Sequence, residues 1–298
     1  MRRIYALISF LLIGLAVMLS LMVGFYLVSI PVARDKIAII DLRGELTGGE
    51  ESLPYTTTGE IQRSFENARR DNKVKAVVLA VDSPGGEAAA CYEMYSVVKR
   101  FEKPVVAFIK GTGASGAYLV SLGADRIVAH PFSKVGSIGV YIEFETPVPV
   151  EPENATQIYA ISSGKLKDIW ADGVLDENER KFLRMKVGEM KDAFFNLVFQ
   201  RTGIKRSIME NLEENVENPL YVLVEGGWFG GEKAFELGLV ENLGDLTDAL
   251  QLAAELAGIK LEEARVVKIE PPPVGTYEDL FFETPLYQDN ETLPIYLK

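Results

Sequence analysis

Two hydrophobic patterns alternate through the first half of the chain. Short apolar runs within 36–46, 74–86 and 103–111 predict buried strands. Between these runs, apolar residues recur every three or four positions at 59–71 and 87–101, which predicts amphipathic helices. Buried strands that alternate with helices are typical of a parallel sheet with crossover helices. The sequence therefore predicts an α/β fold.

The second half of the chain continues the alternation less regularly. It predicts, in order, a short helix up to Gly123, a strand at 125–130, a proline-rich surface loop at 145–153, a long amphipathic helix at 176–203, a helix at 246–258 and a strand at 264–273. The long helix begins with an acidic first turn, as stable helices often do. Beyond Pro271 the pattern is irregular, which indicates a tail or arm.

The N-terminal segment differs from everything that follows. It is uncharged from Ile4 to Ala33, longer than the roughly 20 apolar residues that cross a bilayer. We therefore predict one transmembrane helix, an uncleaved signal anchor. A cleaved signal peptide is the alternative, but its apolar region is about 7 to 15 residues long. Arg2 and Arg3 precede the apolar run and place the N-terminus in the cytoplasm, so the rest of the chain is expected on the extracytoplasmic side of the cell membrane.

These patterns divide the chain into three parts. Residues 1–35 are the predicted anchor, 36–270 the folded domain and 271–298 the C-terminal tail or arm. The length of the middle part is sufficient for one sizeable core.

Charge argues against a nucleic-acid partner, and the cysteine content excludes an intrachain disulfide. The chain carries 43 acidic and 31 basic residues, a net charge of -12, so phosphate backbones are repelled and no nucleic-acid partner is expected. Cys91 is the one cysteine, which excludes an intrachain disulfide. Its place in a helical stretch favours a small core residue over a reactive thiol.

A serine at a predicted strand-to-helix turn is the first candidate for chemistry. Ser115 lies between small residues in "GTGASGAYLVS", and a serine needs an adjacent base to become a nucleophile. The single histidine, His130, has no context that suggests a triad. Lysine is the other base known to pair with serine, and Lys165 and Lys167 lie in "SGKLKDIW". An ordinary lysine has a pKa of about 10.4, so such a base must be buried to lose its proton near neutral pH.

Other residues complete this hypothesis. Ser137 in "VGSIGV" can orient a neutral lysine, while Gly85, Gly86 and Gly116 can present backbone N–H groups to an oxyanion. The acidic stretch "DGVLDENE" at 172–179 lacks the residue order of a calcium loop, and its acids are expected to cap the following helix. We therefore expect neither a metal nor a cofactor.

Four motifs in this order carry a family resemblance: "VDSPGGE", "GTGASGAYLVSLGADRIVAHP", "VGSIGV" and "SGKLKDI". Together, behind an N-terminal anchor, they resemble the short form of signal peptide peptidase A, a Ser-Lys peptidase, over about residues 36–265. The resemblance implies Ser115 as nucleophile, Lys167 rather than Lys165 as general base, and Ser137 as the residue that hydrogen-bonds this lysine. It places the oxyanion glycine in the Gly85–Gly86 pair, where Gly86 is preferred.

The resemblance also implies a wider set of properties. The fold is expected to be related to the Clp protease and crotonase superfamily. The chain is expected to assemble into a homo-oligomeric ring with shared active sites, and to degrade remnant signal peptides and other short or unfolded peptides near the membrane.

Two other functions remain open. A crotonase-type enzyme that acts on acyl thioesters would share the fold and would depend on carboxylates, for which Glu87 is the only indication. Glu87 is better explained as a favourable charge at a helix N-terminus. A non-catalytic membrane scaffold built on a peptidase fold is the second alternative.

Overall fold

The computed structural model describes residues 12–20, 22, 34–49, 55–143, 166, 169, 175–209 and 212–270. Most of the predicted anchor and the whole tail at 271–298 lie outside these residues. Residues 12–20 are helical and their side chains are exposed. Within the described ranges, no helix combines the length and apolar character that a membrane span requires.

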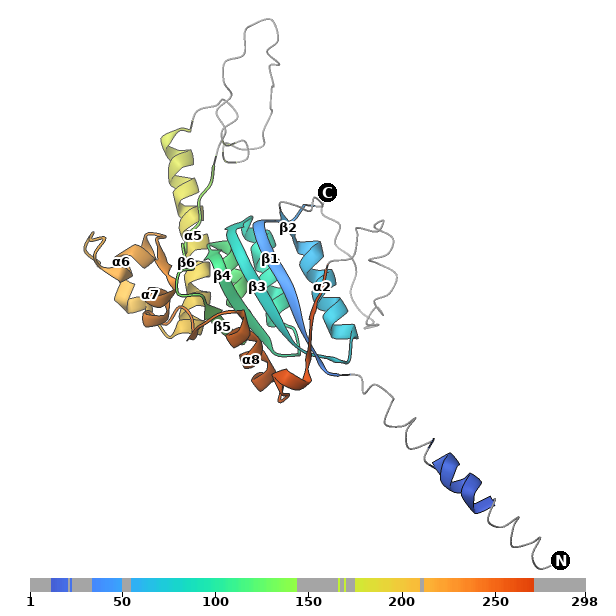
Figure 1. Cartoon of the computed structure of the whole chain (residues 1–298). Coiled ribbons are helices and arrows are strands. Elements are labelled where there is room, and N and C mark those ends of the chain that lie inside the picture. The colour runs from blue at the N-terminus through green and yellow to red at the C-terminus, as the bar shows by residue number, and fades with distance from the viewer. Residues whose placement is uncertain are drawn as a thin grey trace, which may run out of the picture.

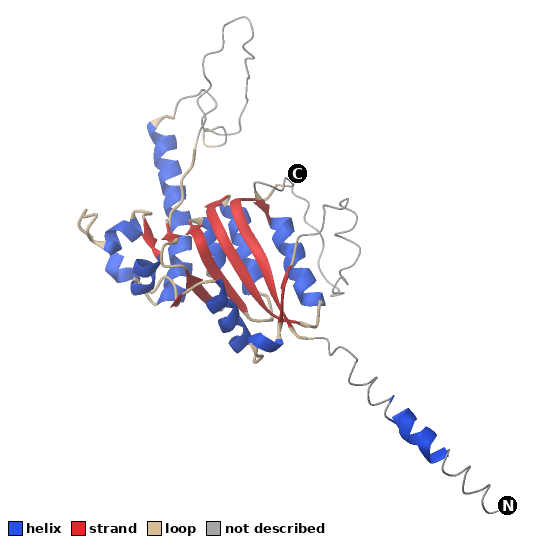
Figure 2. Ribbon diagram, in the orientation of Figure 1, coloured by secondary structure: helices blue, strands red, loops and turns tan. Residues whose placement is uncertain are grey.

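One sheet organises the described part of the chain (Figures 1 and 2). Its main strands lie in the order β2-β1-β3-β4-β5-β8 and all pair in parallel. Three short or peripheral strands extend it: β6 pairs with β4, β7 pairs antiparallel with β6, and β9 pairs with β1. The bounds are β1 Lys36–Thr47, β2 Thr56–Thr57, β3 Val74–Gly86, β4 Val105–Ala114, β5 Arg126–Ala129, β6 Lys134–Gly136, β7 Trp228–Gly230, β8 Asn242–Leu243 and β9 Arg265–Lys268.

Helices cover both faces of this sheet. From residue 34 onward, the described helices are α2 Thr58–Arg70, α3 Ala88–Lys99, α4 Gly116–Ser121, α5 Glu177–Thr202, α6 Pro219–Val224, α7 Gly231–Glu236 and α8 Leu246–Leu256, with short 3-10 turns at Arg206–Met209 and Leu261–Glu263. The larger core lies on the face covered by α2, α3 and α4, and the smaller one lies under α8. The predicted parallel α/β arrangement is therefore confirmed.

The central strands contain continuous apolar runs, Ala76–Val81 in β3 and Val105–Ile109 in β4, because both sides of these runs are buried. In β3, Val77 and Leu79 belong to the larger core, whereas Ala76 and Val78 face the smaller one with α8. A strand with one face in solvent would instead alternate apolar and polar residues. This two-sided burial explains why the sequence showed continuous apolar runs.

The long helix α5 has clear start and stop signals. Asp176 is its N-cap and forms a capping box with Glu179, and Gly203 ends the helix in the left-handed conformation with φ +72°. This confirms the expectation that the acids before the helix cap it. The predicted strand at 264–273 proves shorter, since β9 ends at Lys268 before the prolines.

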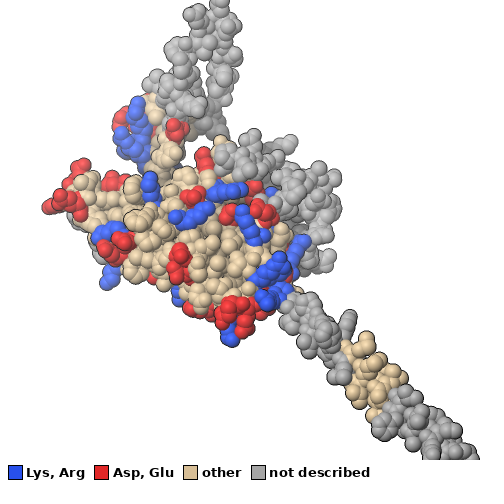
Figure 3. Space-filling view, in the orientation of Figure 1, with Lys and Arg blue, Asp and Glu red and all other residues tan. Residues whose placement is uncertain are grey.

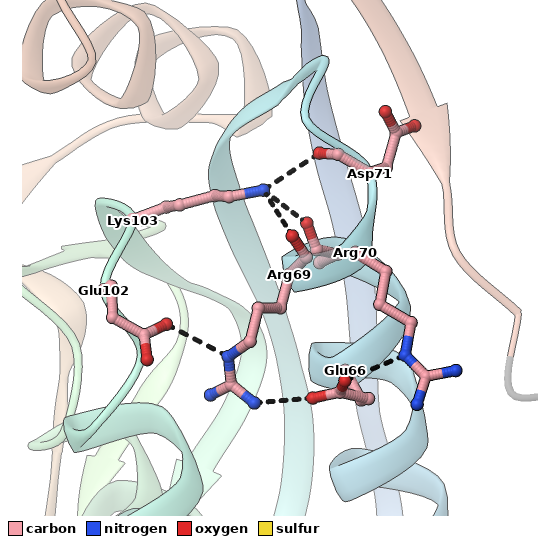
Figure 4. Close-up of polar contacts among 7 residues, drawn as sticks. Glu66, Arg69, Arg70, Asp71, Glu102 and Lys103 are labelled. Atoms are coloured by element: carbon pink, nitrogen blue, oxygen red, sulfur yellow. Dashed lines mark hydrogen bonds and ion pairs between the residues drawn. The ribbon is translucent and has the colours of Figure 1, made fainter. Parts of the chain in front are cut away.

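Basic and acidic side chains are interspersed over the face of the molecule in Figure 3. A cluster at the C-terminal end of α2 shows one use of these charges (Figure 4). The Lys103 ammonium donates hydrogen bonds to the carbonyl oxygens of Ala68, Arg69 and Asp71, at 2.6, 3.2 and 2.9 Å. The last carbonyls of a helix lack partners within it, so this lysine caps α2 from the loop before β4.

Tyr118 ties α4 to a distant part of the chain. Its side chain is fully buried and its hydroxyl donates to the carbonyl oxygen of Leu239 at 2.7 Å. Burial raises the pKa of Tyr118, so the hydroxyl remains a proton donor across the physiological range. The bond helps to fix the short helix that follows Ser115.

We predict that Tyr118→Phe lowers the free energy of unfolding by about 1–3 kcal/mol, because it leaves a buried carbonyl without this donor. Urea unfolding of the purified protein, followed by far-UV circular dichroism, measures the change. Tyr92→Phe is the matched control, since Tyr92 is 56% exposed and its hydroxyl has no comparable burial. Equal stability of the two variants would contradict the role given to the Tyr118 bond.

Candidate active site

Ser115 occupies the single residue between a strand and a helix. β4 ends at Ala114, and α4 begins at Gly116. Ser115 has φ +51°, a left-handed conformation that non-glycine residues adopt at a cost of about 1–3 kcal/mol. Its N–H donates to the Gly136 carbonyl at 2.8 Å, and its carbonyl accepts from Leu119 at 3.0 Å. The turn is thus held on both sides, and its half-buried serine lies where strained residues often serve function.

Ser137 lies beside Ser115 through strand pairing. Ala114 of β4 is the register partner of Gly136 of β6, and each serine follows one of these residues. Ser137 also has φ +51° and is half-buried. In the described part of the chain, these two serines are the non-glycine residues with positive φ. The structure therefore brings together two of the residues that the sequence analysis selected.

The three candidate oxyanion glycines meet at the same place. A Cβ atom on Gly85, where φ is +105°, would lie 2.7 Å from the Gly116 nitrogen and 3.0 Å from Ser115 Cβ. A Cβ on Gly86 would collide with the backbone of Leu46, and one on Gly116 would collide with Cys91 Sγ. Close backbone approach thus explains why these positions require glycine.

The backbone N–H groups at the end of β3 differ in what they bind. The Gly85 N–H donates to Ser83 Oγ at 3.1 Å, and the Glu87 N–H donates to the Leu46 carbonyl at 2.8 Å. The Gly86 nitrogen lies close to the start of α4, since a Cβ on Gly116 would be 3.4 Å from it. The geometry favours Gly86 over Gly85 as a donor.

Ser83 is a polar residue near the end of β3 that was not among the residues expected in the site. It is fully buried, and its hydroxyl accepts the Gly85 N–H. Its position in "VDSPGG", two residues before the first glycine, is the spacing at which a serine side chain accepts a backbone N–H in a turn. That signal was available from the sequence.

Cys91 lies beneath the turn as a structural residue. Burial, with the negative charge of Glu87 as a second cause, raises the pKa of the Cys91 thiol to about 12. The thiol therefore stays protonated near neutral pH and is a poor nucleophile. This is the small core residue that the sequence predicted.

The candidate general bases do not lie among the residues described so far. Lys165 and Lys167 both lie outside the described residues, although Leu166 between them is described. His130 lies after β5, where its Nδ1 accepts the N–H of Phe132 at 3.3 Å. Among the described residues, no group of three or more histidine, cysteine or acidic side chains is placed to bind a metal.

Comparison with known sequences links the chain to peptidases. The model of Peptidase family S49 matches residues 98–260, and that of Clp protease matches residues 56–135. A protein of Methanocaldococcus jannaschii named as a protease is 32% identical over 202 residues, which cover 67% of this chain. The chain spans 61% of that relative's length. A protein of Enterococcus faecium named signal peptide peptidase SppA is 28% identical over 251 residues, 82% of this chain and 69% of that protein.

A solved structure supports the fold. A mutant of the 1510-N membrane-bound stomatin-specific protease superposes with a TM-score of 0.53 at 15% sequence identity, covering 81% of this chain and 100% of that one. At this identity the likeness concerns the fold alone. Together with the Clp protease match, it confirms the predicted α/β fold of Clp protease type. The resemblance to the signal peptide peptidase A family is confirmed by the family match and the Enterococcus relative.

We predict that Gly116→Ala destabilises the protein by about 1–3 kcal/mol, because its new methyl group meets Cys91 Sγ. Cys91→Ala removes that sulfur, so the double variant should lose less stability than the sum of the two single variants. Urea unfolding of all four proteins gives the coupling energy, expected at about 0.5–3 kcal/mol. Strict additivity would show that Gly116 and Cys91 are not in the contact described.

Proposed function

Because the chain belongs to Peptidase family S49, we propose that it is a membrane-anchored serine endopeptidase in which Ser115 and Lys167 form a catalytic dyad. One observation carries this proposal: Ser115 is held in a left-handed turn beside Ser137 and against Gly85, Gly86 and Gly116. A nucleophile, a hydroxyl to orient its base and backbone donors are the parts that acyl transfer by a Ser-Lys enzyme requires.

The proposed mechanism assigns a task to each group. Neutral Lys167 accepts the Ser115 hydroxyl proton while Oγ attacks the peptide carbonyl carbon. The N–H groups of Gly86 and Gly116 stabilise the oxyanion, and Ser137 orients the lysine amine. Lys167 then protonates the leaving amine and the peptide bond breaks. The same lysine deprotonates the water that hydrolyses the acyl-enzyme, which restores the serine.

Substrates and setting follow the family resemblance. We propose that the enzyme degrades remnant signal peptides and other short or unfolded peptides near the membrane. The segment at 1–35 would anchor it in the cell membrane as a single span, with the domain on the extracytoplasmic side. Assembly into a homo-oligomeric ring would place active sites toward an enclosed space. The name of the Enterococcus relative, a signal peptide peptidase, supports this setting.

The crotonase-type alternative gains no support from the site. Its only indication was Glu87, whose carboxylate accepts hydrogen bonds from Thr47 and Gly48. Activity measurements distinguish the non-catalytic scaffold from the peptidase.

We predict that Ser115→Ala and Lys167→Ala each reduce hydrolysis of an apolar fluorogenic peptide by at least about a thousandfold, since each removes one half of the dyad. Lys165→Ala is the matched control, because it removes a neighbouring lysine that the mechanism does not use. The assay uses the full chain in detergent micelles. Activity that survives Ser115→Ala would contradict the mechanism, and inactivity of the intact wild type would favour the scaffold.

The wild-type rate should rise from pH 6 toward pH 10. The mechanism uses the neutral lysine amine, whose fraction grows about tenfold per pH unit below its pKa. A pH profile of kcat/KM for the same peptide measures this dependence. A rate that peaks near pH 6 and falls with increasing pH would contradict lysine as the base.

A further inference from the structure

Glu87 joins the end of β1 to the end of β3, where Gly86 lies. Leu46 and Gly86 are register partners at the ends of β1 and β3, and the Glu87 N–H donates to the Leu46 carbonyl at 2.8 Å. Glu87 Oε1 accepts from the Thr47 hydroxyl at 3.0 Å, and Oε2 accepts from the Gly48 N–H at 2.9 Å. One residue thus makes three hydrogen bonds to three consecutive residues.

A favourable charge at a helix start does not account for these bonds. Glu87 is the N-cap of α3, but its side chain makes no hydrogen bond to the first turn of that helix. Both carboxylate oxygens are directed at Thr47 and Gly48 instead. Attraction to the helix dipole depends on charge and needs no such pairing.

The Gly85–Gly86 end of β3, just before Glu87, depends on restraint by its neighbours. Gly85 and Gly86 have no side chains, so this backbone has more conformational freedom than any other pair of residues would allow. On its N-terminal side, Ser83 Oγ accepts the Gly85 N–H. On its C-terminal side, Gly86 pairs in register with Leu46 of β1, and the hydrogen bonds of Glu87 to residues 46–48 follow directly after it.

We propose that Glu87 is a positioning residue that holds the Gly86 N–H in line with the oxyanion formed at Ser115. This inference rests on the proposed peptidase function. Glu87 acts through the backbone and does not touch the substrate. Removing it lets the Gly85–Gly86 segment move, and a donor that is misplaced by a fraction of an ångström stabilises the transition state less.

The effect of Glu87 should appear in catalysis more than in stability. Its side-chain bonds are exposed to solvent, where polar contacts contribute little to folding. An oxyanion donor, in contrast, acts mainly in the transition state, so its misplacement lowers kcat and leaves KM nearly constant. Measuring both the kinetic constants and the stability therefore distinguishes a positioning role from a structural role.

We predict that Glu87→Ala lowers kcat for peptide hydrolysis about tenfold, with KM within about twofold of wild type and a melting temperature within about 2 °C. Glu87→Gln should retain most of the activity, because the amide can still pair with the Thr47 hydroxyl and the Gly48 N–H. Glu93→Ala is the matched control. It removes the same charge from α3, where the carboxylate contacts only Gln62 among the described hydrogen bonds.

The Glu87 variants test the positioning role, and Ser115→Ala tests the peptidase mechanism. Wild-type kcat in Glu87→Ala would overturn the positioning role, as would equal loss in Glu87→Ala and Glu87→Gln, which would indicate a charge effect. A large fall in melting temperature that accompanies the loss of kcat would indicate a structural role instead. Ser115→Ala in the same assay tests the proposed function independently, since its full activity would overturn the peptidase mechanism whatever Glu87 does.

Discussion

The parallel pairing of β3 between β1 and β4 is the constraint on which the site depends. It brings the C-terminal ends of three strands to one edge of the sheet, where functional groups of open α/β sheets usually lie. Ser115 follows β4, the Gly85–Gly86 pair ends β3, and Leu46 lies near the end of β1. These groups can meet only because each strand is held in register by a core that covers both faces of the sheet.

Close backbone approach then determines the residue types at this edge. Gly86 lies against the Leu46 backbone and Gly116 against the Cys91 sulfur, so neither position has room for a side chain. The serine that follows β4 is held in its left-handed conformation by the pairing of β4 with β6 before it and by the hydrogen bond from the Leu119 N–H to its carbonyl after it. A tightly packed turn can therefore hold a strained residue whose cost is offset by the surrounding sheet.

Much of this arrangement could be predicted from the sequence because it has a periodic signal. The buried strands and the amphipathic helices α2, α3, α5 and α8 were recognisable from their apolar patterns. β2, β7 and β8 were not, since two or three residues carry no period and their pairing is decided by distant partners. The proximity of Ser115 to Ser137 depends on the β4–β6 register, which no local pattern specifies.

Individual residues of the site could likewise be predicted where a local pattern identifies them, and not where their partners are distant in sequence. The glycines were identified because sharp turns and close contacts require them, and Ser83 could have been identified from its spacing in the turn. Glu87 was assigned to the helix start because its partners, Thr47 and Gly48, are 40 and 39 residues away in sequence. The choice of Lys167 rests on family resemblance, and no spacing argument alone separates it from Lys165.

The most direct test of the central claim is to trap the nucleophile. The intact protein in detergent would be treated with a peptidyl fluorophosphonate, digested and mapped by mass spectrometry. The account predicts one covalent adduct, on Ser115 Oγ, that is lost in Ser115→Ala and strongly reduced in Lys167→Ala. An adduct on another residue, or equal labelling of wild type and Ser115→Ala, would contradict it.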